Sequence, residues 1–318
     1  MTAAIEIKEL CKCYGRRVAV DGLNLTIEAG EVFGFVGPNG AGKTSTIRIL
    51  AGLLRPTSGE ASVAGFSILQ SPAEVKSRIG YMPDFFGVYP DLSVQEYLEF
   101  FSACYQVPEQ RRPPLIEELL ELVELTHRRT DMVDQLSRGL KQRLSLARTL
   151  IHDPQVLLLD EPAAGLDPRA RIEIRELLVE LARMGKTVFF STHILSDVAE
   201  ICNRVGIIEA GKLVAVGGLE QLHLQVLQRR QIELTLLDRL DEAAHLLEQR
   251  ENVSQVERRP ATNENGRQRL TFEFTGDDAA LSQLLFYLVQ NDMPVLHFSE
   301  DARNLEDVFM RTTQGIVS

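Results

Sequence analysis

"GPNGAGKT", residues 37–44, is the stretch that decides the fold. It follows a continuous apolar run, "VFGFV", and it precedes a helical pattern of apolar residues that extends from Lys43 to about Leu54. G-x-x-x-x-G-K-[ST] between a buried strand and a helix is the P-loop pattern, whose backbone N–H groups surround phosphate oxygens. The sequence therefore predicts a phosphate-binding loop at the end of a buried strand.

Each residue type in this loop has a defined part in phosphate binding. The glycines let the backbone turn its N–H groups inward, and the N-terminus of the following helix adds a fixed positive end. Lys43 is expected to reach the β- and γ-phosphates, and the Thr44 hydroxyl is expected to bind Mg²⁺. The residues expected to contact a nucleotide here are Gly37, Pro38, Asn39, Gly40, Ala41, Gly42, Lys43, Thr44 and Ser45.

A second motif, "VLLLDEP" at residues 156–162, places two carboxylates after another apolar strand. Asp160 ends the strand, where it is positioned to hold Mg²⁺. Glu161 follows, positioned to polarise a water molecule in line with the γ-phosphate. An acidic pair after a strand is weak evidence alone, but with a P-loop upstream it predicts a site for nucleotide hydrolysis.

The order of strands and helices predicts an α/β fold with two domains. Short strands in residues 4–36 and two buried strands separated by an amphipathic segment at 169–184 indicate a parallel sheet with crossover helices. A mostly helical region opens at Ser93 and Glu96, which have the spacing of a capping box. Near Leu224 the composition changes, and the patterns beyond it suit a small α+β sandwich. The predicted domains are residues 1–223, with a helical subdomain at about 85–152, and residues 224–318.

The composition excludes several classes of protein. A chain of 318 residues with 44% apolar residues has enough material for a sizeable core. The formal net charge of -11 and the pI near 5.2 argue against binding of nucleic acid through the overall field. No apolar run approaches the ~20 residues that cross a bilayer, and the first residues lack a signal-peptide pattern. The spacing of the four cysteines is typical of a reduced, cytosolic chain.

A third motif, "LSRGLKQRLSLARTL" at residues 136–150, lies between the P-loop and the acidic pair. Ser137 is placed to cap the helix that follows, and Gly139 leaves the first turn open to close approach, which together predict another anion site. An isolated L-S-x-G is more often an ordinary capped helix. The order of the motifs along the chain favours the anion site.

Over residues 5–216 the chain resembles the ATP-binding cassette family, the ATPase subunits of ABC transporters. The resemblance rests on ordered motifs at family-like spacing: Tyr14 ahead of the P-loop, the P-loop itself, the signature around Ser137 and Gly139, Asp160 with Glu161, "AAGLD" ending in Asp167, and His193 after a strand. It implies a P-loop NTPase cassette with a RecA-like parallel sheet core, an antiparallel β subdomain and an inserted helical subdomain. It also implies ATP and Mg²⁺ as ligands.

The resemblance implies roles for the remaining site residues. Tyr14 would stack on adenine, and His193 would contact the γ-phosphate and link it to Glu161, the catalytic base. Two cassettes in this family pack head to tail, so that the signature of one meets the γ-phosphate held by the other, with Asp167 coupling the two sites. The implied partners are a second copy or a homologous cassette and integral membrane permease subunits, with this chain peripheral on the cytoplasmic face of the membrane.

The tail and three departures refine the resemblance. The segment that ends in "LEDVFMRTT", residues 305–313, resembles the C-terminal extension of export-type cassettes, a branch that includes drug, natural-product, sodium and gliding-related exporters. It implies a role in contact between cassettes or in regulation. Arg138 and Leu140 replace Gly and Gln in the usual signature L-S-G-G-Q, and Asp84 stands where the family usually has Gln.

Asp84, in "YMPDFFGVYP" at residues 81–90, has two interpretations. After a proline it is an ordinary turn residue. At the junction of the nucleotide core and the helical subdomain it would face Mg²⁺ and the attacking water, in contact with the metal directly or through water. We expect the second, with Phe85, Phe86 and Tyr89 beginning the surface offered to the permease.

The leading interpretation is an ATP-hydrolysing subunit that powers export through separate permease subunits. Two alternatives stay open at this point: a soluble cassette ATPase that acts on ribosomes or DNA, and an ATP-dependent clamp that hydrolyses weakly because of the three departures. The single cassette and the acidic charge argue against the first, and the retained Glu161 and His193 argue against the second. The transported substrate is not readable from this chain.

Overall fold

The structure is a computed structural model that describes residues 3–85, 87, 89, 91–218, 230–259 and 268–300. These residues fall into two compact units, residues 3–218 and residues 230–300. Some features singled out in the sequence lie outside the described residues: Phe86, the boundary placed between residues 223 and 224, and "LEDVFMRTT" at residues 305–313.

A six-stranded sheet forms the centre of the first unit, in the order β10-β9-β3-β8-β7-β6. β3 pairs in parallel with β8 and β9, and β7 pairs in parallel with β6 and β8. Only the edge strand β10 is antiparallel, to β9. This arrangement confirms the predicted parallel core. The strands are β3 (Val32–Val36), β6 (Ile79–Met82), β7 (Val156–Asp160), β8 (Thr187–Thr192), β9 (Arg204–Glu209) and β10 (Lys212–Gly218).

A second, antiparallel sheet has the order β2-β1-β4-β5. Its strands are β1 (Ala3–Tyr14), β2 (Arg17–Glu28), β4 (Ser58–Val63) and β5 (Phe66–Ser67). The sequence predicts short strands here, whereas β1 and β2 have 12 residues each. The register of β1 shifts between Ile7 and Leu10, where Glu9 adopts a φ of 46°. Such bulges interrupt the alternation of period two, so only fragments of each strand are visible in the sequence.

The main core of the first unit lies where the two sheets and α1 (Lys43–Leu50) meet. Buried side chains from both sheets contact those of α1, among them Leu23, Phe35, Ile47 and Leu158. α1 is shorter than the predicted helix, because Gly52 takes a φ of 66° just after the helix and turns the chain. The packing fixes the start of α1 against the ends of the parallel strands.

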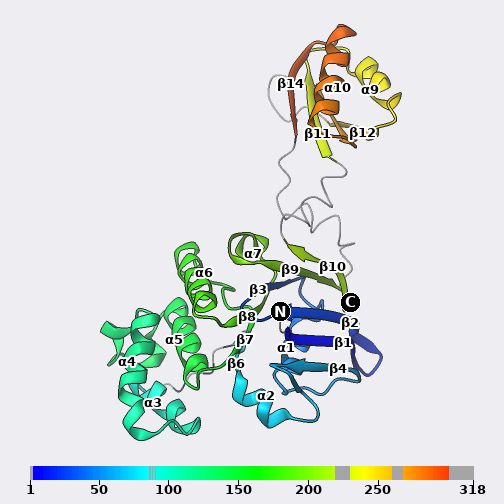
Figure 1. Cartoon of the computed structure of the whole chain (residues 1–318). Helices are drawn as coiled ribbons and strands as arrows, with labels where there is room; N and C mark the ends of the chain where they lie inside the picture. The colour runs from blue at the N-terminus through cyan, green and yellow to red at the C-terminus, as the bar shows by residue number, and fades with distance from the viewer. Residues whose placement is uncertain are drawn as a thin grey trace. The chain divides into compact units, whose positions relative to one another are not determined.

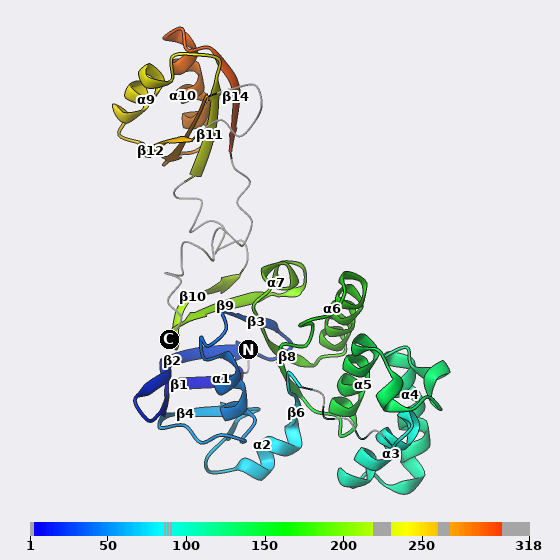
Figure 2. The same cartoon turned by 180° about the vertical axis from the view of Figure 1, so that it is seen from behind.

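A group of helices stands at one side of the parallel sheet, away from β1, β2 and β4 (Figures 1 and 2). It contains α3 (Val94–Cys104), α4 (Arg112–Leu122) and α5 (Arg138–Leu150), with short 3₁₀ turns at Glu109–Arg111, Thr126–Arg128 and Val133–Gln135. The remaining helices of this unit are α2 (Pro72–Arg78), α6 (Pro168–Arg183) and α7 (Leu195–Ile201).

A buried arginine ties the helical group to α6. Arg143 on α5 donates to the carbonyl oxygen of Val123, at 3.1 Å, and pairs with Glu124, at 2.8 Å, at the end of α4. Its other terminal nitrogen pairs with Glu173 of α6 at 2.5 Å. Because a buried guanidinium is stable only when its donors are satisfied, these contacts fix how α4, α5 and α6 pack.

The second unit is a four-stranded antiparallel sheet, in the order β12-β13-β11-β14, with two helices. Alternate residues of β11 and β13, such as Leu234 and Phe272, are buried with Leu247 and Leu288 from the helices. The helices therefore share one face of the sheet, as the sequence predicts for an α+β sandwich. The elements are β11 (Arg230–Leu236), α9 (Leu240–Glu248), β12 (Val253–Arg259), β13 (Gln268–Phe274), α10 (Asp278–Gln290) and β14 (Val295–Glu300).

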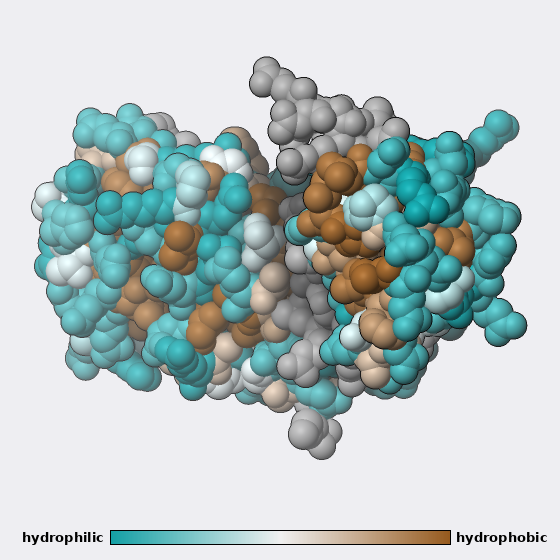
Figure 3. Space-filling view, turned by 90° about the horizontal axis from the view of Figure 1, so that it is seen from above, coloured by the Kyte–Doolittle hydropathy of each residue, from teal (hydrophilic) through white to brown (hydrophobic). Residues whose placement is uncertain are grey.

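On the face drawn in Figure 3 most residues are hydrophilic, and hydrophobic residues lie among them, in part gathered into patches. The most exposed large apolar side chains include Phe85, 75% exposed, Leu237, 68%, and Phe286, 63%. Among the described helices, none combines the length and the apolar character needed to span a bilayer.

The predicted capping box at the start of α3 is confirmed and provides a test of local stability. Ser93 Oγ accepts the N–H of Glu96, and Glu96 Oε2 accepts the N–H of Ser93 at 2.8 Å. We expect Ser93→Ala to destabilise the first turn of α3 by about 1 kcal/mol. Faster hydrogen exchange of the amides that begin α3 would report this loss.

Ser71 provides the matched control, because it precedes α2 but makes no capping hydrogen bond with its side chain. Ser71→Ala should leave exchange in α2 unchanged. Equal effects of the two substitutions would contradict the capping role of Ser93.

Candidate functional site

The P-loop joins the end of β3 to the start of α1 in a conformation that requires glycine. A Cβ at Gly37 would lie 2.3 Å from the carbonyl oxygen of Ile208, so no larger residue fits between the loop and β9. Gly42 has a φ of 109°, and a Cβ there would lie 2.3 Å from the carbonyl oxygen of Ala19. These close approaches hold the loop at the N-terminus of α1, where a helix attracts anions.

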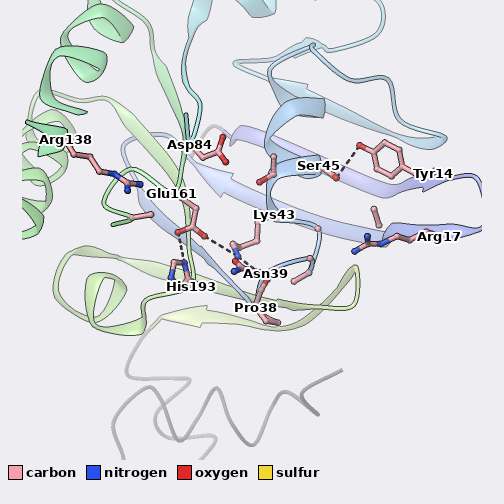
Figure 4. A pocket seen from close by; sticks show the side chains of 16 residues that line it. Tyr14, Arg17, Pro38, Asn39, Lys43, Ser45, Asp84, Arg138, Glu161 and His193 are labelled. Atoms are coloured by element: carbon pink, nitrogen blue, oxygen red, sulfur yellow. Dashed lines mark hydrogen bonds and ion pairs between the residues drawn. The ribbon is translucent and has the colours of Figure 1, made fainter. Parts of the chain in front are cut away.

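A cavity of about 470 Å³ opens beside this loop, and residues 38–45 line it together with Tyr14, Asp84, Glu161 and His193 (Figure 4). These residues come from six segments of the first unit: the end of β1, the P-loop, α1, the segments after β6 and β7, and the residue after β8. The structure thus brings together most of the residues that the sequence predicts for the site.

Asp160 lies beneath the cavity wall, fully buried at the end of β7. Its Oδ1 accepts hydrogen bonds from Ser191 Oγ at 2.7 Å and from Thr44 Oγ1 at 3.1 Å. Its Oδ2 is buried without a hydrogen-bond partner among the described residues. Burial raises the pKa of this carboxyl, although the two hydrogen bonds oppose the shift. A buried carboxylate oxygen without a partner is costly unless a cation or another donor reaches it.

Glu161 is held at the cavity by its backbone as well as by its side chain. It adopts a φ of 51°, which is uncommon for a residue with a side chain, and its N–H donates to Ser191 Oγ at 3.0 Å. Oε1 lies 3.3 Å from Lys43 Nζ, and Oε2 lies 2.9 Å from His193 Nδ1. The carboxylate is therefore fixed between a cation and an imidazole at one end of the cavity.

Lys43 is buried, and its ammonium group has three partners. Nζ donates to the carbonyl oxygens of Gly37, at 2.6 Å, and Pro38, at 3.2 Å, and it pairs with Glu161 at 3.3 Å. Two hydrogen bonds and one ion pair therefore hold the positive charge directly against the P-loop.

Tyr14 lies at the opposite end of the cavity from Glu161 and His193 (Figure 4). Its hydroxyl is 3.5 Å from Ser45 Oγ, and Lys12 Nζ lies 5.1 Å from the centroid of its ring. The ring is about half exposed, which leaves an aromatic surface available beside the loop. Stacking of such a ring on a base is physically reasonable.

Ser137, Gly139 and Asp167 do not line this cavity. Ser137 Oγ accepts the N–H three residues further along α5 at 3.4 Å, which confirms the predicted cap. Asp167 Oδ1 accepts the N–H groups of Arg169 and Ala170 at the start of α6, at 3.1 and 3.0 Å. A Cβ at Gly139 would lie only 3.0 Å from the Ala170 side chain, so the first turns of α5 and α6 are close neighbours.

Asp84 is exposed and lines the cavity after β6 and Pro83. Its negative charge adds to the effect of burial in raising the pKa of Asp160. The structure therefore supports its interpretation as a residue of the site. Its contact with a metal ion stays a prediction.

Ser191, Arg17 and Arg138 belong to the site but are not predicted as site residues from the sequence. Ser191 supports both Asp160 and Glu161, and the register that pairs Asp160 with Ser191 on the neighbouring strand explains how. Arg17 pairs in register with Tyr14 and lines the cavity. Arg138, noted only as a departure from the family pattern, also lines this cavity. The position of each of these residues at the site depends on strand register or helix packing, which the sequence alone did not provide.

Comparison with known proteins gives consistent matches. A family model described as "ABC transporter" matches residues 20–164. The bacitracin transport ATP-binding protein of Bacillus licheniformis is 36% identical, over 99% of this chain and 99% of that protein. The Nod factor export ATP-binding protein I of Cupriavidus metallidurans is 40% identical, over 70% of this chain and 73% of that protein.

A solved structure supports the fold and the chemistry. It is a dimeric ATP-binding cassette in a post-hydrolysis state bound to ADP and Pi, with a TM-score of 0.61 and 28% identity, and it covers 68% of this chain and 98% of that chain. Together with the match to a relative over nearly the whole length, it establishes that the chain belongs to the ABC transporter family, as a subunit that binds and hydrolyses ATP.

Proposed function

We propose that this chain powers an exporter by ATP-driven closure of two cassettes, with the membrane-spanning permease supplied by separate subunits. The observation that carries this proposal is the chain of contacts from Lys43 through Glu161 to His193 at one end of the P-loop cavity. It joins the cation that would bind phosphate to the carboxylate that would act as a general base.

ATP would lie along the cavity with its base at Tyr14 and its phosphates at the P-loop. The backbone N–H groups of residues 38–45 and the N-terminus of α1 would bind the β- and γ-phosphates. Lys43 would transfer donors from its present partners to phosphate oxygens. The γ-phosphate would then come next to Glu161 and His193.

The residues around Asp160 fit a bound Mg²⁺. Mg²⁺ usually binds one or two protein oxygens together with phosphates of the substrate and water. The unpartnered Oδ2 of buried Asp160 and the neighbouring Thr44 hydroxyl are suitable donors, and Asp84 is a further carboxylate on the same cavity. When bound, the ion would neutralise charge that develops on the transferred phosphoryl group.

Glu161 would act as the general base that accepts the proton of the attacking water. His193 orients it through the hydrogen bond of 2.9 Å and would itself contact the γ-phosphate. The imidazole is partly exposed and the carboxylate is mostly buried, so water reaches the γ-phosphate side while the base keeps a fixed geometry.

The second cassette would complete the site from the other side. Ser137 and Gly139 stand at the first turn of α5 and do not line the cavity of their own chain, which supports a role opposite the nucleotide of a partner. Asp167 caps the adjacent α6, whose Ala170 lies next to Gly139, and would couple the two sites. Hydrolysis would remove the γ-phosphate bridge and let the cassettes separate.

Export is supported by the relatives, whose names refer to bacitracin transport and Nod factor export. No name among these refers to ribosomes or DNA.

We propose that the chain is peripheral on the cytoplasmic face of the membrane, where Phe85 and Tyr89, both exposed, contribute to the surface that receives the permease. The domain after residue 223 would contact the other cassette or regulate closure.

Glu161→Gln tests the catalytic base. The amide cannot accept a proton from water, so we expect kcat for ATP hydrolysis to fall by roughly 10²–10⁴-fold while ATP binding persists and an ATP-bound dimer accumulates. Phosphate release and sedimentation in the presence of Mg²⁺ and ATP would measure both effects. Glu180→Gln, the same change at an exposed carboxylate of α6, should alter neither. Unchanged phosphate release from Glu161→Gln would exclude this role.

Lys43→Ala tests a different failure, the loss of nucleotide binding itself. Removal of a charge-assisted hydrogen bond to phosphate should weaken ATP affinity by roughly tenfold or more. Equilibrium dialysis with labelled ATP provides the measurement, and Lys8→Ala, at an exposed lysine of β1, is the control. If Lys43→Ala bound ATP as tightly as the unmodified chain, the assigned phosphate site would be wrong.

Asp84→Asn tests coupling to the permease. The substitution keeps the shape of the side chain and removes its charge, so we expect substrate transport by the complete transporter to fall more than ATP affinity does. Asp91→Asn, at an exposed position a short distance along the chain, serves as the control. Full transport by Asp84→Asn would return Asp84 to the role of an ordinary turn residue.

A further inference from the structure

Arg138 lies at the catalytic end of the cavity of its own chain. It is the first residue of α5, directly between Ser137 and Gly139, yet unlike them it lines the cavity with Glu161 and His193. Figure 4 shows its guanidinium extended toward Glu161, on the side opposite Tyr14 and Arg17. One residue of the signature therefore faces the nucleotide site in cis.

The path of this side chain depends on a glycine in the loop that precedes α6. Gly165 has a φ of 68°, and a Cβ built on it would lie 2.5, 2.6 and 2.8 Å from Nη1, Cζ and Nη2 of Arg138. The guanidinium of Arg138 therefore occupies the space that a side chain at position 165 would need. Gly165 and Arg138 are complementary in shape at this point.

The charges at this end of the cavity favour a further cation. Glu161 and Asp84 line the cavity, and Lys43 is already paired with Glu161. Within the part of the chain that the structure describes, no hydrogen bond or ion pair engages the guanidinium of Arg138. A planar guanidinium with free donors suits the bidentate binding of phosphate oxygens.

We propose that Arg138 binds the γ-phosphate of the ATP held by its own chain, while Ser137 and Gly139 serve the partner's site. This inference rests on the proposed placement of the phosphates at the P-loop. The departure from the usual signature thus adds a specificity residue that distinguishes ATP from ADP before the two cassettes close.

The test compares nucleotide affinities of the full-length chain at a concentration where sedimentation shows monomers. The ligands are the β,γ-imido analogue of ATP and ADP, each with Mg²⁺. Arg138→Ala should lower the affinity for the analogue by roughly tenfold and leave the affinity for ADP unchanged, because only the analogue has a γ-phosphate. Arg138→Lys should retain part of the preference. Lys141→Ala removes a cation from the same helix that binds the carbonyl oxygen of Asp134, and it should change neither affinity.

Each other outcome overturns the proposal. If Arg138→Ala lowered the affinities for both ligands equally, the effect would be structural. An unchanged affinity for the analogue would exclude the contact. A loss of affinity confined to dimers would place Arg138 at the partner's nucleotide. Lys43→Ala separates this proposal from the proposed function. If the Lys43→Ala variant bound the ATP analogue tightly, the phosphate site itself would be refuted. If Lys43→Ala lost affinity for the analogue and Arg138→Ala kept it, only the role of Arg138 would be refuted.

Gly165→Ala provides an independent check. The added methyl group should displace the flexible guanidinium and cause a similar selective loss of the analogue. In the Arg138→Ala background the same change should cause no further selective loss, because the displaced group is absent. Fully additive losses would contradict the coupling between the two residues.

Discussion

The hydrogen bond from Ser191 Oγ to Asp160 Oδ1, 2.7 Å long, joins the ends of two neighbouring parallel strands, and the end of the site that holds Glu161 and His193 is built around it. β7 carries Asp160 and Glu161, and β8 leads directly to His193. β3, on the other side of β8, leads to the P-loop. Because parallel strands share the direction in which they end, three separate motifs arrive at one edge of the sheet. The strands are fully buried, so a shift in register would misplace all of these groups at once.

Glu161, a residue of the site, has a strained backbone conformation. Its φ of 51° is unfavourable for a residue with a side chain, and residues in such conformations persist only when their surroundings hold them. Ser191 accepts the N–H of Glu161 while it donates to Asp160, so one hydroxyl stabilises both the strand end and the turn after it. The turn aims the carboxylate at Lys43 and His193.

The elements with a continuous signal were predictable from the sequence. The apolar runs gave the strands β3, β7 and β8, and Ser93 with Glu96 marked the start of α3. The P-loop and Glu161 of the acidic pair were predicted as site residues, and residues 38–45 and Glu161 line the cavity. The lengths of β1 and β2 were not predictable, because bulges near Glu9 break their alternation. The sequence showed Arg138 only as a departure from the usual signature. The direction of its side chain was not predictable, because it depends on the packing of α5 against the loop at Gly165.

In the proposed mechanism, Lys43 would connect nucleotide binding to the state of Glu161. Its ammonium group donates hydrogen bonds to Gly37 and Pro38 and pairs with Glu161, so a phosphate oxygen would compete with these partners for the same cation. The contact with Glu161 is the longest of the three, and a phosphate brings the stronger negative charge to the same cation. Replacement of Glu161 by phosphate at Lys43 would free Oε1, while Oε2 would remain fixed by His193. In the proposed mechanism, the carboxylate would thus become available to accept a proton when the γ-phosphate is in place.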